Sequence, residues 1–130
     1  MAETQASITE WMEATFPGAD PASPRKALRL MEEVVELCLA AGAAPSAIRE
    51  TVISTLHKCC DKVQDDHESR PLPDKVPGEA ADVAIILNGF ASTRRFVLQD
   101  EIDDKMKINR GRTWAPRGDG TGYHVNPKQE

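Results

Sequence analysis

Acidic residues at helical spacing are the side chains of this sequence whose types could do chemistry. Glu32, Glu33 and Glu36 form the pattern EExxE, and Glu79 and Asp82 form the pattern ExxD. In each pattern the last two acids are three residues apart and would share one face of an α-helix. If two such helices packed side by side, four or five carboxylates would meet. Like charges so close need a counter-charge, and Mg²⁺ prefers oxygen ligands of this kind.

The simpler interpretation of a glutamate cluster is a solvated helix face, and the second pattern argues against it. At helical spacing, Glu79 and Asp82 fall on the same side as Val83, Ile86 and Phe90. Carboxylates that continue an apolar face are expected to enter a helix bundle. Because buried carboxylates are costly unless paired or metal-bound, the two patterns together predict a metal site.

A second stripe begins apolar and ends polar. Leu98, Ile102, Lys105, Asn109 and Arg112 recur every three or four residues. A helix that delivers an amide and two cations to one place suits a phosphate group. The alternative is that these long side chains only snorkel from an amphipathic helix. Two positions later, Trp114 could stack on a nucleobase or pack on its own domain.

Periodicity predicts an all-α protein, a bundle of about five helices, in which these residues lie on the second, fourth and fifth helices. Ser7 or Thr9 could cap the first helix, and Ser23 with Pro24 could start the second. We expect no strands. Residues 1–114 would form the helical domain and residues 115–130 a glycine-rich tail. The predicted helices span about residues 6–15, 24–41, 45–64, 77–93 and 96–110, with a polar loop at 65–77.

Length and charge set the class of protein. A chain of 130 residues is one domain by length, and a net charge of −5 argues against a general nucleic-acid surface. The charge is uneven, because six Lys or Arg face only two acids from Lys105 onward. Three cysteines, two of them adjacent, do not make a disulfide framework and fit a reducing compartment. With no signal peptide and no membrane-spanning run, we expect a cytoplasmic protein, in the host cytoplasm if viral.

The order of these patterns resembles one family. EExxE, then ExxD on a later helix, then Lys105-x-x-x-Asn109-x-x-Arg112-x-Trp114, is similar to the MazG-like nucleoside triphosphate pyrophosphohydrolases. They belong to the all-α NTP pyrophosphatase superfamily, with the dimeric dUTPases. The resemblance covers about residues 25–114. The gap between Glu36 and Glu79 is longer than these families usually show.

The resemblance implies a Mg²⁺-dependent enzyme, with Mn²⁺ as a substitute, that hydrolyses an NTP to NMP and pyrophosphate. It implies catalytic roles for Glu32, Glu33 and Glu36, and a substrate-binding group of Lys105, Asn109, Arg112 and Trp114. The metal ligands would be Glu33, Glu36, Glu79 and Asp82. Two or more Mg²⁺ would neutralise the triphosphate and activate water, which a glutamate would orient or deprotonate. Lys105 and Arg112 would hold the leaving pyrophosphate.

The resemblance also suggests a substrate and an oligomeric state. Overall size and the long insert resemble the phage MazZ branch, which implies a purine deoxynucleotide, dGTP or dATP. Base contacts are expected from Trp11, Phe16, Trp114 or the loop before Glu79. The alternatives are a pyrimidine-specific dUTPase or dCTPase of the same superfamily, and a non-catalytic helical interaction module. The apolar stripes and the superfamily both predict a homo-oligomer, a dimer or tetramer.

Overall fold

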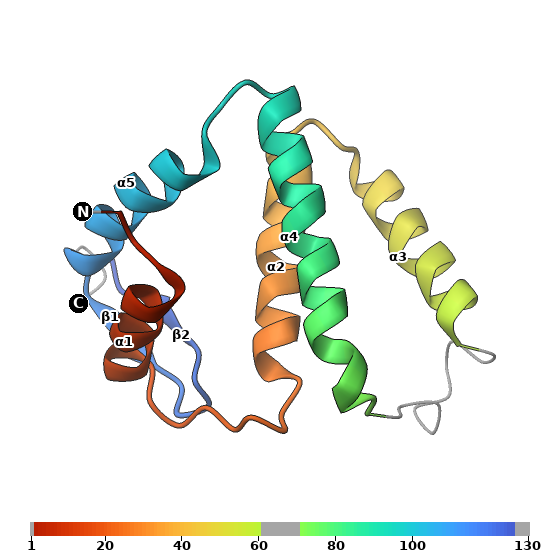
Figure 1. Ribbon diagram of the computed structural model, residues 1–130. Helices are drawn as coiled ribbons and strands as arrows, with labels where there is room; N and C mark the ends of the chain where they lie inside the picture. Colours follow the sequence, from red (N-terminus) through yellow and green to blue (C-terminus); the bar gives the residue numbers. More distant parts are fainter. Residues whose placement is uncertain (1, 61–70, 127–130) are drawn as a thin grey trace. The chain divides into compact units, whose positions relative to one another are not determined.

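The computed structural model describes residues 2–60 and 71–126 (Figure 1). In these residues the chain is mostly helical, which confirms the predicted all-α class. None of the described helices is long and apolar enough to cross a membrane. The elements are α1 (Gln5–Thr15), α2 (Arg25–Ala40), α3 (Pro45–Cys59), the 3₁₀ turn η2 (Pro73–Lys75), α4 (Val76–Thr93), α5 (Leu98–Arg110), β1 (Trp114–Pro116) and β2 (Gly122–His124).

The chain divides into two compact units. Unit 1 contains both ends of the chain, Met1–Ala27 and Glu79–Glu130, and unit 2 is the segment between them, Leu28–Gly78. Unit 1 therefore holds α1, α5, both strands and nearly all of α4, while unit 2 holds most of α2 and all of α3. The acids of the EExxE pattern belong to unit 2, and Glu79 and Asp82 belong to unit 1.

The first two helices have clear local start and stop signals. Thr4, and not Ser7 or Thr9, is the N-cap of α1: its side chain accepts from the Ser7 N–H, and the Ser7 hydroxyl accepts from the Thr4 N–H. Before α2, the Ser23 hydroxyl accepts a hydrogen bond from Arg25 N–H. The helix starts at Arg25, one residue later than the predicted Pro24. Gly42 ends α2 with a φ of +99°, the left-handed conformation of a glycine stop.

The two largest differences from the predicted helix boundaries are at the end of α3 and at the start of α5. Cys60 is extended, so α3 ends at Cys59, before the predicted Gln64; residues 61–64 lie outside the described residues. Helix α5 begins at Leu98 and not at the predicted Phe96, because the residues before Leu98 form the C-terminal cap of α4. In that cap Phe96 N–H bonds to Ala91 O at 3.1 Å, and Arg95 has a φ of +62° where glycine is usual.

Aromatic rings from the two ends of the chain form the core of unit 1. Phe16 is 7% exposed and meets Trp11 and Trp114 edge-to-face, at centroid distances of 5.6 and 5.4 Å. Trp114 also meets Trp11 at 5.9 Å and His124 at 5.8 Å. These contacts tie α1 to the C-terminal strands (Figure 1). Rings that pack in this way stabilise a small core beyond the area they bury.

The predicted coil after Gly111 is instead a β-hairpin. Strands β1 and β2 pair antiparallel, with Trp114 opposite His124 and Pro116 opposite Gly122. Arg117 N–H bonds to Thr121 O at 2.9 Å across the connection, and Thr121 is buried. Strands of three residues are too short to show the alternation on which sequence analysis depends.

Glycine lets this hairpin approach the loop after α1 closely. A Cβ atom on Gly122 would lie 2.6 Å from the Phe16 ring, and one on Gly18 would lie 2.1 Å from the Gly118 carbonyl oxygen. Arg25 Nε lies 3.4 Å from the Asp119 carboxylate in the same region. The glycine-rich segment is therefore packed against the N-terminal part of unit 1.

Candidate functional site

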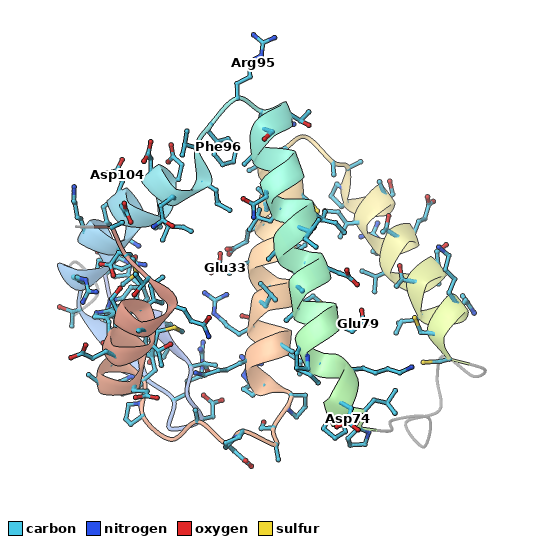
Figure 2. All side chains as sticks on the ribbon, viewed as in Figure 1. Glu33, Asp74, Glu79, Arg95, Phe96 and Asp104 are labelled. Atoms are coloured by element: carbon cyan, nitrogen blue, oxygen red, sulfur yellow. The ribbon has the colours of Figure 1, made fainter. Side chains whose placement is uncertain are left out.

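The EExxE acids all lie on α2 in unit 2, at a spacing that puts them on one side of this helix. Figure 2 labels Glu33. A hydrogen bond between the Glu33 and Glu36 carboxyl groups raises the pKa of Glu36, and the Glu33 charge adds to this effect. The structure thus brings these two acids together. A divalent cation could bind to both carboxylates of such a pair and offset their like charges.

Arg29 supplies the positive charge beside these acids. Its guanidinium donates a hydrogen bond to Glu33 and lies 3.4 Å from a Glu32 oxygen. All three side chains are at least one-third exposed, so each ion pair is weak in water and easily exchanged. Arg29 therefore neutralises part of the acidic cluster without closing it. Arg29 was not among the residues predicted for the site, although its i, i+4 spacing to Glu33 is visible in the sequence.

Glu79 and Asp82 lie in the first two turns of α4, and both side chains are exposed, contrary to the burial expected for them (Figure 2, where Glu79 is labelled). They are three residues apart on one helix, as predicted. The large apolar side chains that follow, Val83 and Ile86, are 42% and 72% exposed. Across residues 2–60 and 71–126, no three His, Cys, Asp or Glu side chains form a group that could hold a metal ion.

Of the cations on α5 and just after its end, two make ion pairs and two do not. Arg110 makes a bidentate ion pair with Glu3, and Lys107 lies 3.9 Å from Asp104. Lys105 is exposed and Arg112 is partly exposed. Within the described part of unit 1, neither of these two side chains makes an ion pair or hydrogen bond. They are the two cations assigned to phosphate in the sequence analysis.

Asn109 and Trp114, predicted to lie near substrate, are joined to each other. The Trp114 indole N–H donates to the main-chain oxygen of Asn109 at 2.8 Å. The Asn109 side-chain oxygen is buried and has no hydrogen-bond partner among the described residues. An unpaired buried acceptor costs about 1–3 kcal/mol, so a donor from a ligand would be stabilising there.

The residues that hold α5 to the N-terminal segment were not predicted from the sequence. Glu3 N–H donates to Asp103 Oδ1 at 2.8 Å, and the Gln99 side chain donates to Glu3 O at 2.9 Å and to Asp103 at 2.8 Å. The two bonds that Asp103 accepts, from Glu3 N–H and from the Gln99 side chain, lower its pKa. Asp103 and Lys105 are two positions apart, and so lie on nearly opposite sides of α5 (about 200°). The network thus leaves the Lys105 side of the helix open.

Comparison of this chain with protein-family models, with curated proteins and with solved structures gives no match.

Proposed function

We propose that this protein is a Mg²⁺-dependent nucleoside triphosphate pyrophosphohydrolase, which converts a (d)NTP to (d)NMP and pyrophosphate. The proposal includes a purine deoxynucleotide, dGTP or dATP, as the preferred substrate. Its basis is the resemblance of the three motifs to the MazG-like family.

The observation that carries the proposal is the closeness of the Glu33 and Glu36 carboxyl groups on α2, which raises the pKa of Glu36. Both side chains are exposed on one helix, and the hydrogen bond with Glu33, followed by the Glu33 charge, raises the pKa of Glu36. A structural surface gains nothing from such a pair, because like charges one helical turn apart destabilise a helix. A divalent cation would convert this repulsion into attraction.

The donor set suits a hard divalent cation. Glu33, Glu36, Glu79 and Asp82 offer only carboxylate oxygens, which Mg²⁺ prefers over nitrogen and sulfur. When bound, the metal would supply charge neutralisation of the triphosphate and acidify a water molecule. Glu32 and Glu36 would orient that water or accept its proton. Lys105 and Arg112 would bind the pyrophosphate end, since neither is engaged within its own unit.

The test is a panel of the eight common NTPs and dNTPs with Mg²⁺, scored for both monophosphate and pyrophosphate. Wild-type protein is compared with Asp82→Asn and with Asp104→Asn, which changes an exposed aspartate of α5 that lies 3.9 Å from Lys107. We expect Asp82→Asn to abolish turnover and Asp104→Asn to retain it. Absence of Mg²⁺-dependent hydrolysis for every nucleotide would instead support the helical interaction module.

We also propose that the protein is a homo-oligomer, a dimer or tetramer. Many large apolar side chains of α2, α3 and α4 are exposed in the single chain, including Met31, Ile53 and Ile86, which are 50%, 50% and 72% exposed. Exposed apolar surface on this scale marks an interaction site. Light scattering should give a mass of at least twice 14.3 kDa. A 14.3 kDa particle at working concentration excludes the oligomer.

A further inference from the structure

The indole of Trp114 connects the end of α5 to the aromatic core of unit 1. Its N–H donates to Asn109 O at 2.8 Å, and the same oxygen accepts the Arg112 N–H at 3.2 Å. The last turn of α5 would otherwise end in carbonyl groups without helical donors. Trp114 therefore closes the turn that carries Asn109 and Arg112.

The ring of Trp114 is already engaged by other rings. Trp11, Phe16 and His124 surround it at centroid distances of 5.9, 5.4 and 5.8 Å, and the first two meet it edge-to-face. Phe16, which it contacts, is buried. A nucleobase that stacked on Trp114 would have to compete with contacts that hold the unit together.

We propose that Trp114 is a positioning residue for the triphosphate and does not stack on the base. The inference rests on the proposed function and changes the role that the motif suggests for Trp114. Through its hydrogen bond to Asn109 O, the indole fixes the last turn of α5. It thereby sets where the Asn109 amide and the Arg112 guanidinium meet the phosphates.

The test is the full-length Trp114→Phe variant, which keeps an aromatic ring and removes the N–H donor. Thr121→Val is the matched control: Thr121 is buried in the hairpin and its hydroxyl bonds to Asp119 at 2.5 Å, so this change weakens unit 1 away from α5. Three quantities are measured for each protein: the melting temperature, the kcat/KM for each nucleotide, and the inhibition constant of inorganic tripolyphosphate, which has no base.

Positioning predicts that Trp114→Phe lowers kcat/KM about five- to tenfold, the worth of one hydrogen bond, by the same factor for purines and pyrimidines. The inhibition constant of tripolyphosphate rises in the same variant, because the phosphates are bound less well. Thr121→Val lowers the melting temperature and leaves that constant unchanged. Hydrogen exchange at the Gly111 and Arg112 amides becomes faster in Trp114→Phe only.

Other results overturn the inference. A loss that differs between purines and pyrimidines, with tripolyphosphate inhibition unchanged, shows that Trp114 contacts the base. Equal loss of activity in both variants at equal loss of stability shows a purely structural role. Wild-type protein inactive on every nucleotide removes the proposed function itself, and with it any role of Trp114 toward a triphosphate.

Discussion

Glu3 and Arg110 form a bidentate ion pair across 107 positions of the chain. Arg110 Nε and Nη2 donate to the two carboxylate oxygens of Glu3, both at 3.0 Å. Ser7 also donates its hydroxyl to Glu3 at 2.5 Å. Planar two-point pairing of this kind is the strong form of a carboxylate–guanidinium contact. It fastens the start of the chain to the helix that carries Lys105.

Glu3→Gln should lower the melting temperature at neutral pH, because the amide keeps the shape and loses the charge. The Ser7 hydroxyl bond, followed by Arg110, holds the pKa of Glu3 below its ordinary value of 4.5. A carboxyl group with a depressed folded-state pKa stabilises the fold above its unfolded pKa, and this stability is lost as pH falls through the folded pKa.

The wild-type melting temperature should therefore fall below about pH 4.5, and less steeply in Glu3→Gln. The control is Glu13→Gln, the same change on an exposed glutamate of α1. Thermal melts from pH 3 to pH 7 measure the melting temperatures of wild type and of the two variants. Equal behaviour of the two variants would show that the ion pair adds nothing to stability.

Glu36→Gln should raise the melting temperature at pH 7 without metal. The hydrogen bond and charge of Glu33 raise the pKa of Glu36, so the folded chain holds this proton more tightly than the unfolded chain. The pair is thus destabilising above the folded pKa, and that penalty disappears as pH falls through it. The gain over wild type should vanish in acid.

Added Mg²⁺ should stabilise wild-type protein more than Glu36→Gln, because binding to the folded state alone stabilises it. Glu50→Gln on α3 is the control, and should respond to Mg²⁺ as wild type does. A Glu36→Gln melting temperature below that of wild type at pH 7 would mean that the acid pair stabilises the helix.

Lys105→Ala should reduce triphosphate hydrolysis at least tenfold, about 1.4 kcal/mol in the transition state, with little change in stability. Lys107→Ala is the matched control on the same helix, since the Lys107 side chain is 80% exposed and lies 3.9 Å from Asp104. Activity assays together with melting curves distinguish a phosphate-binding role of Lys105 from a structural role. A parallel loss of fold and activity would identify Lys105 as structural.

Gly18→Ala should destabilise the protein by about 1–3 kcal/mol, the usual cost of overpacking. Gly18 has a φ of +92°, and an added Cβ would lie 2.1 Å from the Gly118 carbonyl oxygen. Gly89→Ala gives the opposite change, a gain of about 0.5–1 kcal/mol, because Gly89 lies in α4 with nothing within 4 Å of the new atom. Urea unfolding measures both, and a neutral Gly18→Ala would contradict the close packing of the hairpin.

Arg95→Gly should stabilise the protein by about 1 kcal/mol, because Arg95 has a φ of +62° at the end of α4, where a side chain is strained. Figure 2 shows its side chain extending outward from this turn. Arg94→Gly, one residue earlier, should instead destabilise, since Arg94 lies over the Phe90 ring at 5.5 Å. Urea unfolding in which Arg95→Gly is the less stable variant would show that the guanidinium itself makes a needed contact.

Periodicity predicted the five helices because each has a long, regular apolar stripe. The ends were less accurate, since they depend on single hydrogen bonds such as that of Thr4 to Ser7. The hairpin was missed because its three-residue strands are stabilised by contacts from distant sequence. Phe16 against Gly122 is one such contact, and it leaves no local pattern.

The candidate site was predictable only where its residues share a helix. The spacing of Glu33 and Glu36 predicted that they share one face of α2, and the effect of Glu33 on the pKa of Glu36 agrees with this. The contact of Trp114 with Asn109 was not predicted, because the indole reaches back to a main-chain oxygen, and main-chain acceptors are common to every residue. The assembly of Glu33 and Glu36 with Glu79 and Asp82 stays a prediction.

Unit 1 is built from the first and last parts of the chain, and this affects its order of folding. During synthesis, Phe16 and Trp11 emerge long before Trp114 and His124, their partners in the ring cluster. Unit 2 is contiguous in sequence and can be completed first. Contacts between residues that are distant in sequence slow folding. Aromatic rings that stay exposed until their partners have been synthesised favour aggregation. A chain that ended just before Trp114 would consequently leave the Trp11 and Phe16 rings without the ring that both of them contact.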